Sequence, residues 1–150
     1  MALSKDEINF YNDQGYLLVE DVISENQHKE MLALVDGFFE KSKMIRENDN
    51  IFDLEDGHSS DNPRLKRIKQ PHQHSQFFWD IIKESKIEEI LRDLLGDNVS
   101  LKTSKLNTKA PGGGAAVEWH QDWAFYPHTN DNVLALSLIH ISEPTRLSVI

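Results

Sequence analysis

The sequence contains no cysteine among its 150 residues, which excludes a disulfide scaffold, a cysteine-ligated zinc site and a thiol nucleophile. It has no apolar run of about 18 residues, and segment 5–7 near its start is charged, so we expect neither a membrane-spanning helix nor a signal peptide. Basic residues are outnumbered, with 16 Lys and Arg against 25 Asp and Glu and a formal net charge of -9. This balance argues against nucleic acid or an anionic membrane as a partner and is typical of a cytoplasmic protein.

The composition, with 39% hydrophobic and 27% charged residues, suits a single globular domain with a real core. Ser4 and Ser24 each begin a capping-box pattern, which predicts two helices, and Gly15 is placed to end the first. Residues 16–19, between these helices, are typical of a buried strand. Residues 46–66 are polar, show no period and are expected to form a surface loop. The second helix carries an apolar stripe that is expected to face the core: Met31, Leu34, Val35, Phe38 and Phe39.

Two further helices and a strand are predicted in the following part of the chain. Ser75 and Ser85 are expected to cap the helices, which pack on a sheet, and Gly96 to end the second. Residues 98–109 then alternate with a period of two, the strongest strand signal in the sequence. Its polar end lies nearest the glycine-rich loop at 111–114, where we expect it to line a pocket for an anion. One face of this strand begins apolar and ends in donors: Val99, Leu101, Thr103, Lys105, Asn107 and Lys109.

His120 and Asp122 are the strongest candidates for a functional site. An imidazole and a carboxylate are two of the three protein ligands that a non-haem iron(II) oxygenase uses. Both residues are expected on an extended segment, where side chains two residues apart point to the same side and can meet one cation. The competing interpretation is a hydrogen-bonded core histidine with Asp122 as its partner, flanked by Trp119 and Trp123 that simply pack.

Similar spacings elsewhere show that the pair alone is weak evidence. His28 and Glu30 fall in a predicted helix, where residues two apart diverge by about 200° and cannot easily share one ion. His72 and His74 fall in a predicted turn, and we interpret both as solvated loop histidines. The context of the His-x-Asp pair must therefore carry its functional interpretation.

Four segments, taken in order, resemble the phytanoyl-CoA dioxygenase family of iron(II)/2-oxoglutarate oxygenases. They are the opening 9–17, the strand segment 105–109, the glycine-rich loop that follows it, and the aromatic segment 119–127 with its His-x-Asp. The similarity covers most of residues 4–135, and the combined order is far more specific than the tripeptide. The resemblance implies an α+β fold, in which N-terminal helices pack on the first strands of a double-stranded β-helix, the jelly roll of the cupins.

The resemblance also implies a site and a reaction. His120 and Asp122 would be the first two iron(II) ligands, Asn107 and Lys105 would contact the co-substrate 2-oxoglutarate, and further candidates for its carboxylates are Arg67 and Lys69. Aromatic residues would line the substrate side: Trp123, Phe125 and Tyr126. The reaction is the oxidative decarboxylation of 2-oxoglutarate by O2 to succinate and CO2, coupled to hydroxylation of a small or acyl-type metabolite.

The sequence departs from the family after Ala135. A segment with a distal histidine ligand and a carboxylate-binding arginine is expected there. Instead, residues 136–146 resemble the translation of a common sequencing-library adaptor. His140 and Arg146 are therefore not interpreted as the missing ligands.

We accordingly expect residues 1–135 to be the N-terminal part of a family domain and residues 136–150 to be a non-native tail, excluded from fold reasoning. A barrel of this type closes by pairing early strands with late ones, so the truncated chain is expected to be inactive and prone to aggregation or dependent on a partner. The alternative is a genuine strand over 133–141, followed by a terminus broken by proline.

Two other functions compete with the oxygenase. One is a non-catalytic ligand-binding module of the same fold, and the other is a different cupin-type metalloprotein that binds another divalent ion through His120 and Asp122. A distal histidine and arginine in the full-length sequence would favour the enzyme over the module. Stimulated succinate production would favour it over the other metalloprotein.

Overall fold

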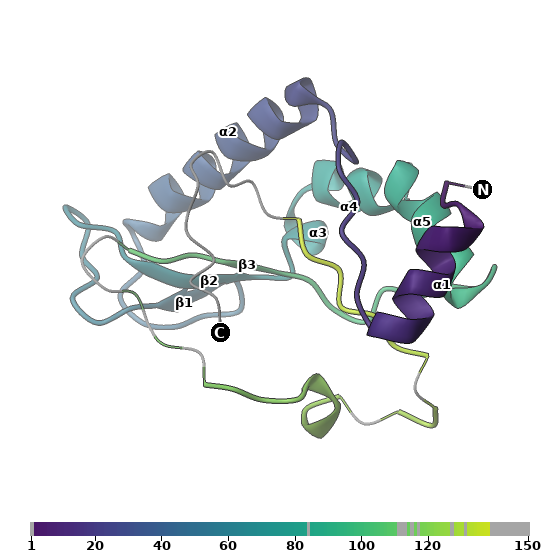
Figure 1. Cartoon of the computed structure of the whole chain (residues 1–150). Coiled ribbons are helices and arrows are strands. Elements are labelled where there is room, and N and C mark those ends of the chain that lie inside the picture. Colours follow the sequence, from purple (N-terminus) through teal and green to yellow (C-terminus); the bar gives the residue numbers. More distant parts are fainter. Residues whose placement is uncertain are drawn as a thin grey trace. The chain divides into compact units, whose positions relative to one another are not determined.

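The computed structural model describes residues 2–83, 85–110, 114, 116, 118–126, 128–130 and 132–138. Its contacts divide the chain into two units, Met1–His120 and Gln121–Ile150, and each is described by itself. Among the described residues, no helix combines the length and apolar character that a membrane span needs. The elements (Figure 1) are, in order, α1 (Lys5–Gln14), α2 (Glu25–Ser42), β1 (Phe52–Leu54), β2 (Leu65–Lys69), α3 (Pro71–His74), α4 (Gln76–Lys83), α5 (Lys86–Leu95), β3 (Lys105–Asn107) and the 3-10 helix η1 (Asp122–Ala124).

The first two helices begin at the predicted capping boxes. The Ser4 hydroxyl accepts from the Glu7 backbone N–H, and the Glu7 carboxylate accepts from the Ser4 backbone N–H at 2.7 Å. Ser24 and Gln27 form the same reciprocal pair at the start of α2. Gly15 ends α1 with φ 77°, a left-handed conformation that favours glycine. Both helix starts were predictable because the interactions that make them span only three residues.

The later helices lie where the sequence predicts them, and the cap at Ser85 is confirmed, whereas the cap at Ser75 stays a prediction. α4 begins at Gln76, directly after Ser75, and the Ser85 hydroxyl accepts from the Ile87 N–H at 3.1 Å at the start of α5. Gly96 caps the end of α5. These two helices bury four apolar side chains: Phe78, Ile81, Ile87 and Ile90.

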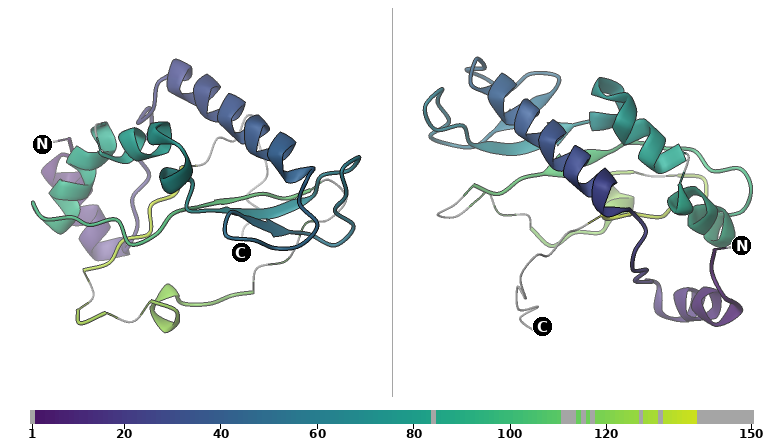
Figure 2. Two further views of the ribbon diagram at one scale, coloured as in Figure 1. Left: turned by 180° about the vertical axis from the view of Figure 1, so that it is seen from behind. Right: turned by 90° about the horizontal axis from the view of Figure 1, so that it is seen from above.

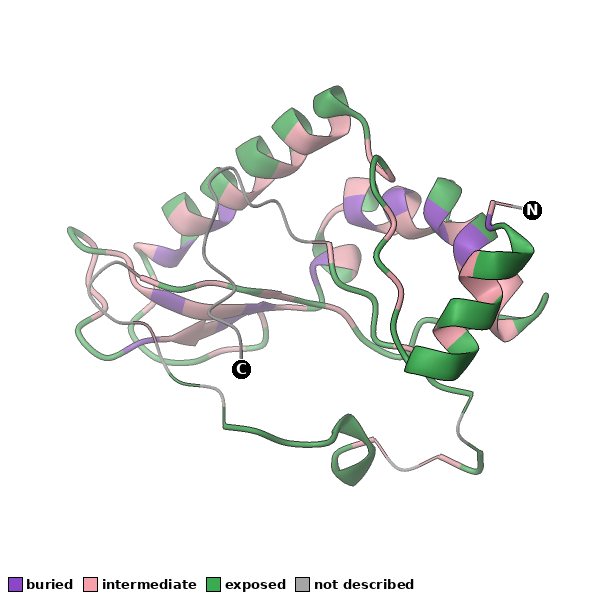
Figure 3. Cartoon of the chain, in the orientation of Figure 1, coloured by how far each residue is buried: buried purple, intermediate pink, exposed green. Residues whose placement is uncertain are grey.

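The main core lies between α2, the sheet and α4. In Figures 1 and 2, α2 crosses one face of the three-stranded sheet, and Figure 3 shows its exposed residues on the side away from that sheet. The buried cluster consists of Phe38, Phe52, Leu65, Ile68 and Phe78. The predicted stripe on α2 is confirmed, because the half-buried side chains packed against this cluster include Met31, Leu34, Val35 and Phe39.

The sheet is antiparallel throughout, with strand order β1-β2-β3. Phe52 and Leu106 flank Ile68 on the face toward α2. The register shifts after Asp53, so that two residues of β2 oppose one of β1 and Leu54 pairs with Leu65. This bulge returns Leu65 to the core face, since one extra residue reverses the alternation of side chains. Both Leu65 and Ile68 are therefore fully buried although three positions separate them.

Two of the strand and loop predictions are wrong. Residues 16–19 form no strand, and Tyr16 and Leu18 are 63% and 79% exposed. The predicted loop 46–66 carries β1 and the first residues of β2, and it supplies Phe52 and Leu65 to the core. A strand of three residues offers too short an alternation to stand out in a polar segment, and its existence depends on a distant partner strand.

The predicted strand 98–109 is confirmed only over Lys105–Asn107. Its register explains the shortening: Lys105 pairs with Lys69, the last residue of β2, and α3 begins two residues later. Residues 98–104 thus have no β2 residue opposite them, and Val99 and Leu101 are exposed. The described elements form a mixed helix and antiparallel-sheet structure, which confirms the α+β class.

Candidate functional site

The two residues predicted to contact 2-oxoglutarate lie on one face of the sheet. In β3, Leu106 points to the core, so Lys105 and Asn107 lie on the opposite, exposed face. Asn107 pairs with Arg67 of β2, and Lys105 pairs with Lys69. The structure therefore brings together four candidate residues that come from two separate segments of the chain. With Asp53 of β1 opposite Arg67, they form what we call the charged sheet face: Asp53, Arg67, Lys69, Lys105 and Asn107.

Asp53 holds two of the cations on this face. Its Oδ1 lies 3.0 Å from Lys69 Nζ, and its Oδ2 lies 3.7 Å from Arg67 Nη1. The side chains of Asp53, Arg67 and Lys69 are only 22%, 35% and 32% exposed, respectively. Within the described part of the chain, Arg67 Nε is buried and has no hydrogen-bond partner. The positive charge of Arg67, Lys69 and Lys105 on this face suits an anionic carboxylate ligand.

Sequence reasoning missed Asp53, because it assigned residues 46–66 to a loop. The available signal was the alternation Phe52-Asp53-Leu54, in which two apolar residues flank one acid. Only the pairing with β2 shows that this acid shares a face with Arg67 and Lys69.

His120 ends the first unit and is exposed. Its Nδ1 lies 2.7 Å from the backbone carbonyl oxygen of Glu118. A carbonyl oxygen can only accept, so Nδ1 carries the proton and Nε2 has the lone pair in the neutral ring. Histidines that bind metals usually donate their second ring N–H in this way, which fixes the tautomer and raises the basicity of the ligating nitrogen.

Asp122 is the first residue of η1 in the second unit. Its backbone carbonyl accepts from the N–H groups of Phe125 and Tyr126 at 2.9 and 3.0 Å. The prediction of an extended segment is therefore wrong for Asp122 and correct for Gln121, whose φ and ψ are -100° and 129°. A turn at this point satisfies backbone groups locally, where a strand would need a partner.

The aromatic residues of the second unit differ in exposure. Trp123 is exposed and its ring meets that of His128 edge to face at a centroid distance of 6.2 Å, whereas Tyr126 is half-buried. Their predicted place beside a substrate stays a prediction, as does the metal site at His120 and Asp122. Over the described residues, no three His, Cys, Asp or Glu side chains lie close enough together to hold a metal ion.

The interpretation of His72 as a solvated loop histidine is wrong. It lies in α3, its Nδ1 shares a hydrogen bond with the Ser104 hydroxyl, and its ring lies 5.8 Å from that of Trp79. Burial lowers the pKa of His72 below its ordinary value of 6.5, and the neighbouring His74 lowers it further. His74 is exposed, as predicted. His72 thus joins α3 to the residue that precedes β3.

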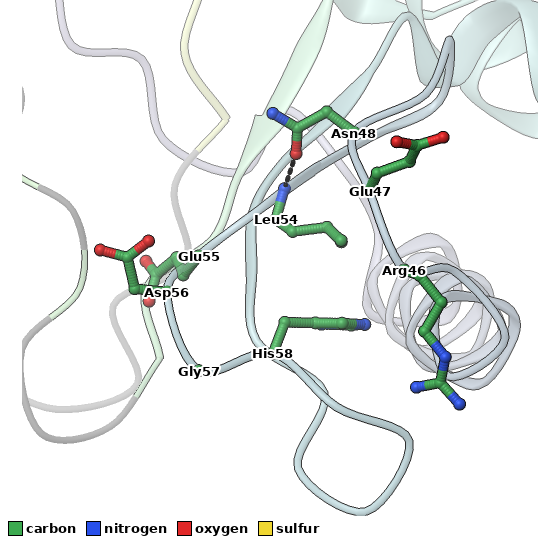
Figure 4. A pocket seen from close by; sticks show the side chains of 8 residues that line it. All are labelled: Arg46, Glu47, Asn48, Leu54, Glu55, Asp56, Gly57 and His58. Carbon is green, nitrogen blue, oxygen red and sulfur yellow. Dashed lines mark hydrogen bonds between the residues drawn. The ribbon is translucent and has the colours of Figure 1, made fainter.

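A surface hollow of about 390 Å³ lies elsewhere in the first unit, between the segments 46–48 and 54–58. Figure 4 shows the Asn48 side chain accepting from the Leu54 backbone N–H, at 2.8 Å, on one side of it. His58, on another side, bridges the Ser42 carbonyl and the Arg64 backbone N–H through its two ring nitrogens. These contacts fasten the end of α2 to the segment before β2, and no candidate site residue lines the hollow.

The chain matches the protein family described as phytanoyl-CoA dioxygenase (PhyH) over residues 11–144. It is 34% identical over 128 residues to the probable alpha-ketoglutarate-dependent hypophosphite dioxygenase of Stutzerimonas stutzeri, a match that covers 85% of this chain and 44% of that protein. It is 24% identical over 141 residues to the ectoine dioxygenase of Bordetella bronchiseptica, covering 94% of this chain and 44% of that protein. No solved structure matches the chain significantly. The chain thus spans less than half the length of these curated relatives.

Proposed function

The chain belongs to the phytanoyl-CoA dioxygenase family, and from this premise we propose that the protein is an iron(II)- and 2-oxoglutarate-dependent dioxygenase that hydroxylates a small or acyl-type metabolite. Alpha-ketoglutarate, in the name of the S. stutzeri relative, is 2-oxoglutarate. The relatives are named for hypophosphite and ectoine, which are both small molecules, and this supports a small substrate. A cytoplasmic location is part of the same proposal.

The observation that carries the proposal is the donor set at His120 and Asp122. The hydrogen bond from His120 Nδ1 to the Glu118 carbonyl gives Nε2 the lone pair, which suits it to bind a metal. A neutral imidazole and a carboxylate are ligands that suit iron(II), and two histidines with one carboxylate form the facial triad of these oxygenases. We propose that the second histidine follows Ala135 in the full-length protein, within a jelly-roll fold that the present strands begin.

The charged sheet face supports the second part of the proposal. Lys105 and Asn107 would bind the carboxylates of 2-oxoglutarate, with Arg67 and Lys69 beside them on β2. When bound, iron and 2-oxoglutarate would supply the oxidative chemistry that turns the keto acid into succinate and CO2 and hydroxylates the substrate. The protein residues bind and orient these groups, and Trp123 and Tyr126 would shield the substrate side from water.

The test is succinate formation by the full-length protein with iron(II), 2-oxoglutarate and O2. We expect His120→Ala and Asp122→Ala to reduce iron affinity and succinate formation by on the order of a hundredfold or more, since even residues behind the ligands contribute up to about that factor. His28→Ala, on α2, is the matched control and should leave both unchanged.

The first step is to sequence the source transcript across the codon for Ala135. A reading frame that continues into a β-rich segment with a distal histidine and arginine supports the oxygenase. If the reading frame encodes neither a distal histidine nor an arginine, the result supports a non-catalytic binding module without iron in place of the oxygenase. Metal binding without succinate formation would instead indicate a different cupin-type metalloprotein.

A further inference from the structure

We propose that Asp53 is a positioning residue for the co-substrate site: it holds Lys69 and Arg67 in place on the charged sheet face, so that both cations are oriented for a dicarboxylate ligand. This inference rests on the proposed function, because it assumes that the charged sheet face binds 2-oxoglutarate. It adds a role for a residue on β1, whereas the proposed contacts with 2-oxoglutarate come from β2 and β3.

The sheet register places Asp53 where it can act on both cations. Asp53 lies directly opposite Arg67, and Lys69 is the next residue of β2 on the same face. Asn107 and Lys105 lie opposite Arg67 and Lys69 on the other neighbouring strand. Across the sheet, the Asp53 carboxylate lies on β1, the two cations lie on β2, and the proposed ligand contacts lie on β3. Asp53 therefore contacts the two cations from the side away from β3.

The contacts of Asp53 leave donors on both cations for a ligand. A lysine ammonium has three donors and a guanidinium has five. Asp53 Oδ1 engages Lys69 Nζ at 3.0 Å, and Oδ2 lies 3.7 Å from Arg67 Nη1. Asp53 thus orients the pair without occupying all of its hydrogen-bonding capacity.

Orientation matters here because both cations sit on long, flexible side chains. A ligand that orders such a side chain loses binding free energy to its conformational entropy, and prior ordering within the protein removes that loss. The partial burial of all three groups strengthens their attraction relative to a pair in open water.

A simple charge argument predicts the opposite effect. Asp53 is negative, so its removal makes the face more positive and attracts any anion more strongly. Positioning predicts that an anion binds more weakly without Asp53. The sign of the change in affinity therefore separates the two roles.

The experiment is calorimetric titration of 2-oxoglutarate into the iron(II)-loaded full-length protein with O2 excluded, with the variants Asp53→Asn and Asp53→Glu. The expected order of affinity is wild type, then Asp53→Glu, then Asp53→Asn, with the last weaker by about threefold. Asp53→Glu keeps the charge but displaces the carboxylate, which explains its intermediate place. Asp36→Asn makes the same charge change on the exposed side of α2 and should leave the affinity unchanged.

Combining Asp53→Asn with Lys69→Gln tests whether Asp53 acts through Lys69. If Asp53 acts through Lys69, the effect of Asp53→Asn should shrink in the Lys69→Gln background. If the unfolding transition shows that Asp53→Asn does not fold, Asp53→Glu distinguishes the two roles. A pure charge role leaves its affinity for 2-oxoglutarate equal to that of the wild type, whereas a positioning role weakens it.

Tighter or unchanged binding by Asp53→Asn overturns the inference, as does a wild type that does not bind 2-oxoglutarate. Succinate assays run in parallel keep the two proposals apart. An active wild type without the expected order of affinities contradicts only the role of Asp53. The expected order in a protein that forms no succinate supports that role and contradicts the dioxygenase.

Discussion

At the scale of single residues, His72 shows how its surroundings set a protonation state. Burial, and then the neighbouring His74, lower the pKa of His72. A histidine whose pKa is lowered in the folded state binds a proton more readily in the unfolded state. The folded state is therefore relatively more stable at pH values above the ordinary pKa of 6.5. That contribution is lost as the pH falls through the lowered folded value.

We expect His74→Gln to raise the pKa of His72 toward its ordinary value, because the substitution removes the second of the two causes. The shift should be partial, since burial, the larger cause, remains. NMR titration of the His72 ring measures it directly. His28→Gln, on α2, should not change the titration, and an unchanged pKa in His74→Gln would contradict the assigned cause.

Asp93 is a second residue whose titration affects stability. Its Oδ2 accepts from the backbone N–H groups of Leu3 and Ala2, at 2.9 and 2.7 Å, and so fastens the segment before α1 to α5. The Leu3 hydrogen bond is the main cause that keeps the pKa of Asp93 below its ordinary value of 3.8, with a further contribution from Ala2 and an opposing one from burial.

We expect Asp93→Asn to lower the urea midpoint of unfolding at neutral pH. An acid with a lowered pKa stabilises the fold above its unfolded value of about 3.8, and the contribution disappears as the pH falls through the folded value. The difference in midpoint between wild type and variant should therefore narrow below about pH 4. A difference that stays constant from pH 7 to pH 3 would show that the hydrogen bonds do not depend on the carboxylate charge.

Some candidate site residues could be named from contiguous sequence, whereas others could be recognised only from the pairing of strands. His120 and Asp122 could be named from the sequence because the tripeptide and its neighbouring segments are contiguous. Asp53 could not, because its role depends on pairing with Arg67, fourteen positions further along. Arg67 and Lys69 could be suggested, but only the register places them opposite Asn107 and Lys105.

At the scale of elements, helices were more predictable than strands for the same reason. The capping boxes at Ser4 and Ser24 are made within single turns and appear where the sequence predicts them. Strand lengths follow from the partner: β2 ends at Lys69, so β3 begins opposite it at Lys105 although the alternation starts earlier. The bulge that brings Leu65 into the core has no signature in the sequence that would have revealed it.

Ile68 is the central side chain of this sheet, fully buried and paired with Phe52 on one side and Leu106 on the other. We expect Ile68→Ala to reduce the free energy of unfolding by about 2–5 kcal/mol and Ile68→Val by about 0.5–1.5 kcal/mol, since both remove buried methyl groups and leave a cavity. Leu32→Ala, at an exposed position of α2, should change it by less than about 0.5 kcal/mol. Urea unfolding measures all three, and equal losses at Ile68 and Leu32 would contradict the described core.

At the scale of the whole molecule, the family match extends well beyond the described core. The family match runs over residues 11–144, whereas the buried hydrophobic residues among the described positions lie between Leu3 and Ile90. The sequence predicted the family from segments in order, without needing their packing. It did not predict the three-stranded sheet, because β1 and β3 are strands of three residues whose pairing with β2 depends on positions distant in the sequence.

The isolated 150-residue chain is expected to associate. β1 and β3 are the outer strands of the sheet, and within the described residues neither has a further strand on its outer edge. Large apolar side chains are exposed as well, among them Leu18, Met44 and Trp119. Open strand edges and exposed apolar surface both favour association between copies.

We expect sedimentation velocity to detect oligomers at concentrations on the order of micromolar, and the full-length protein to remain smaller and better defined under the same conditions. A soluble monomer of the 150-residue chain that unfolds in one sharp cooperative transition would contradict this expectation, because it would mean that the three strands and their helices form a complete folding unit without further strands.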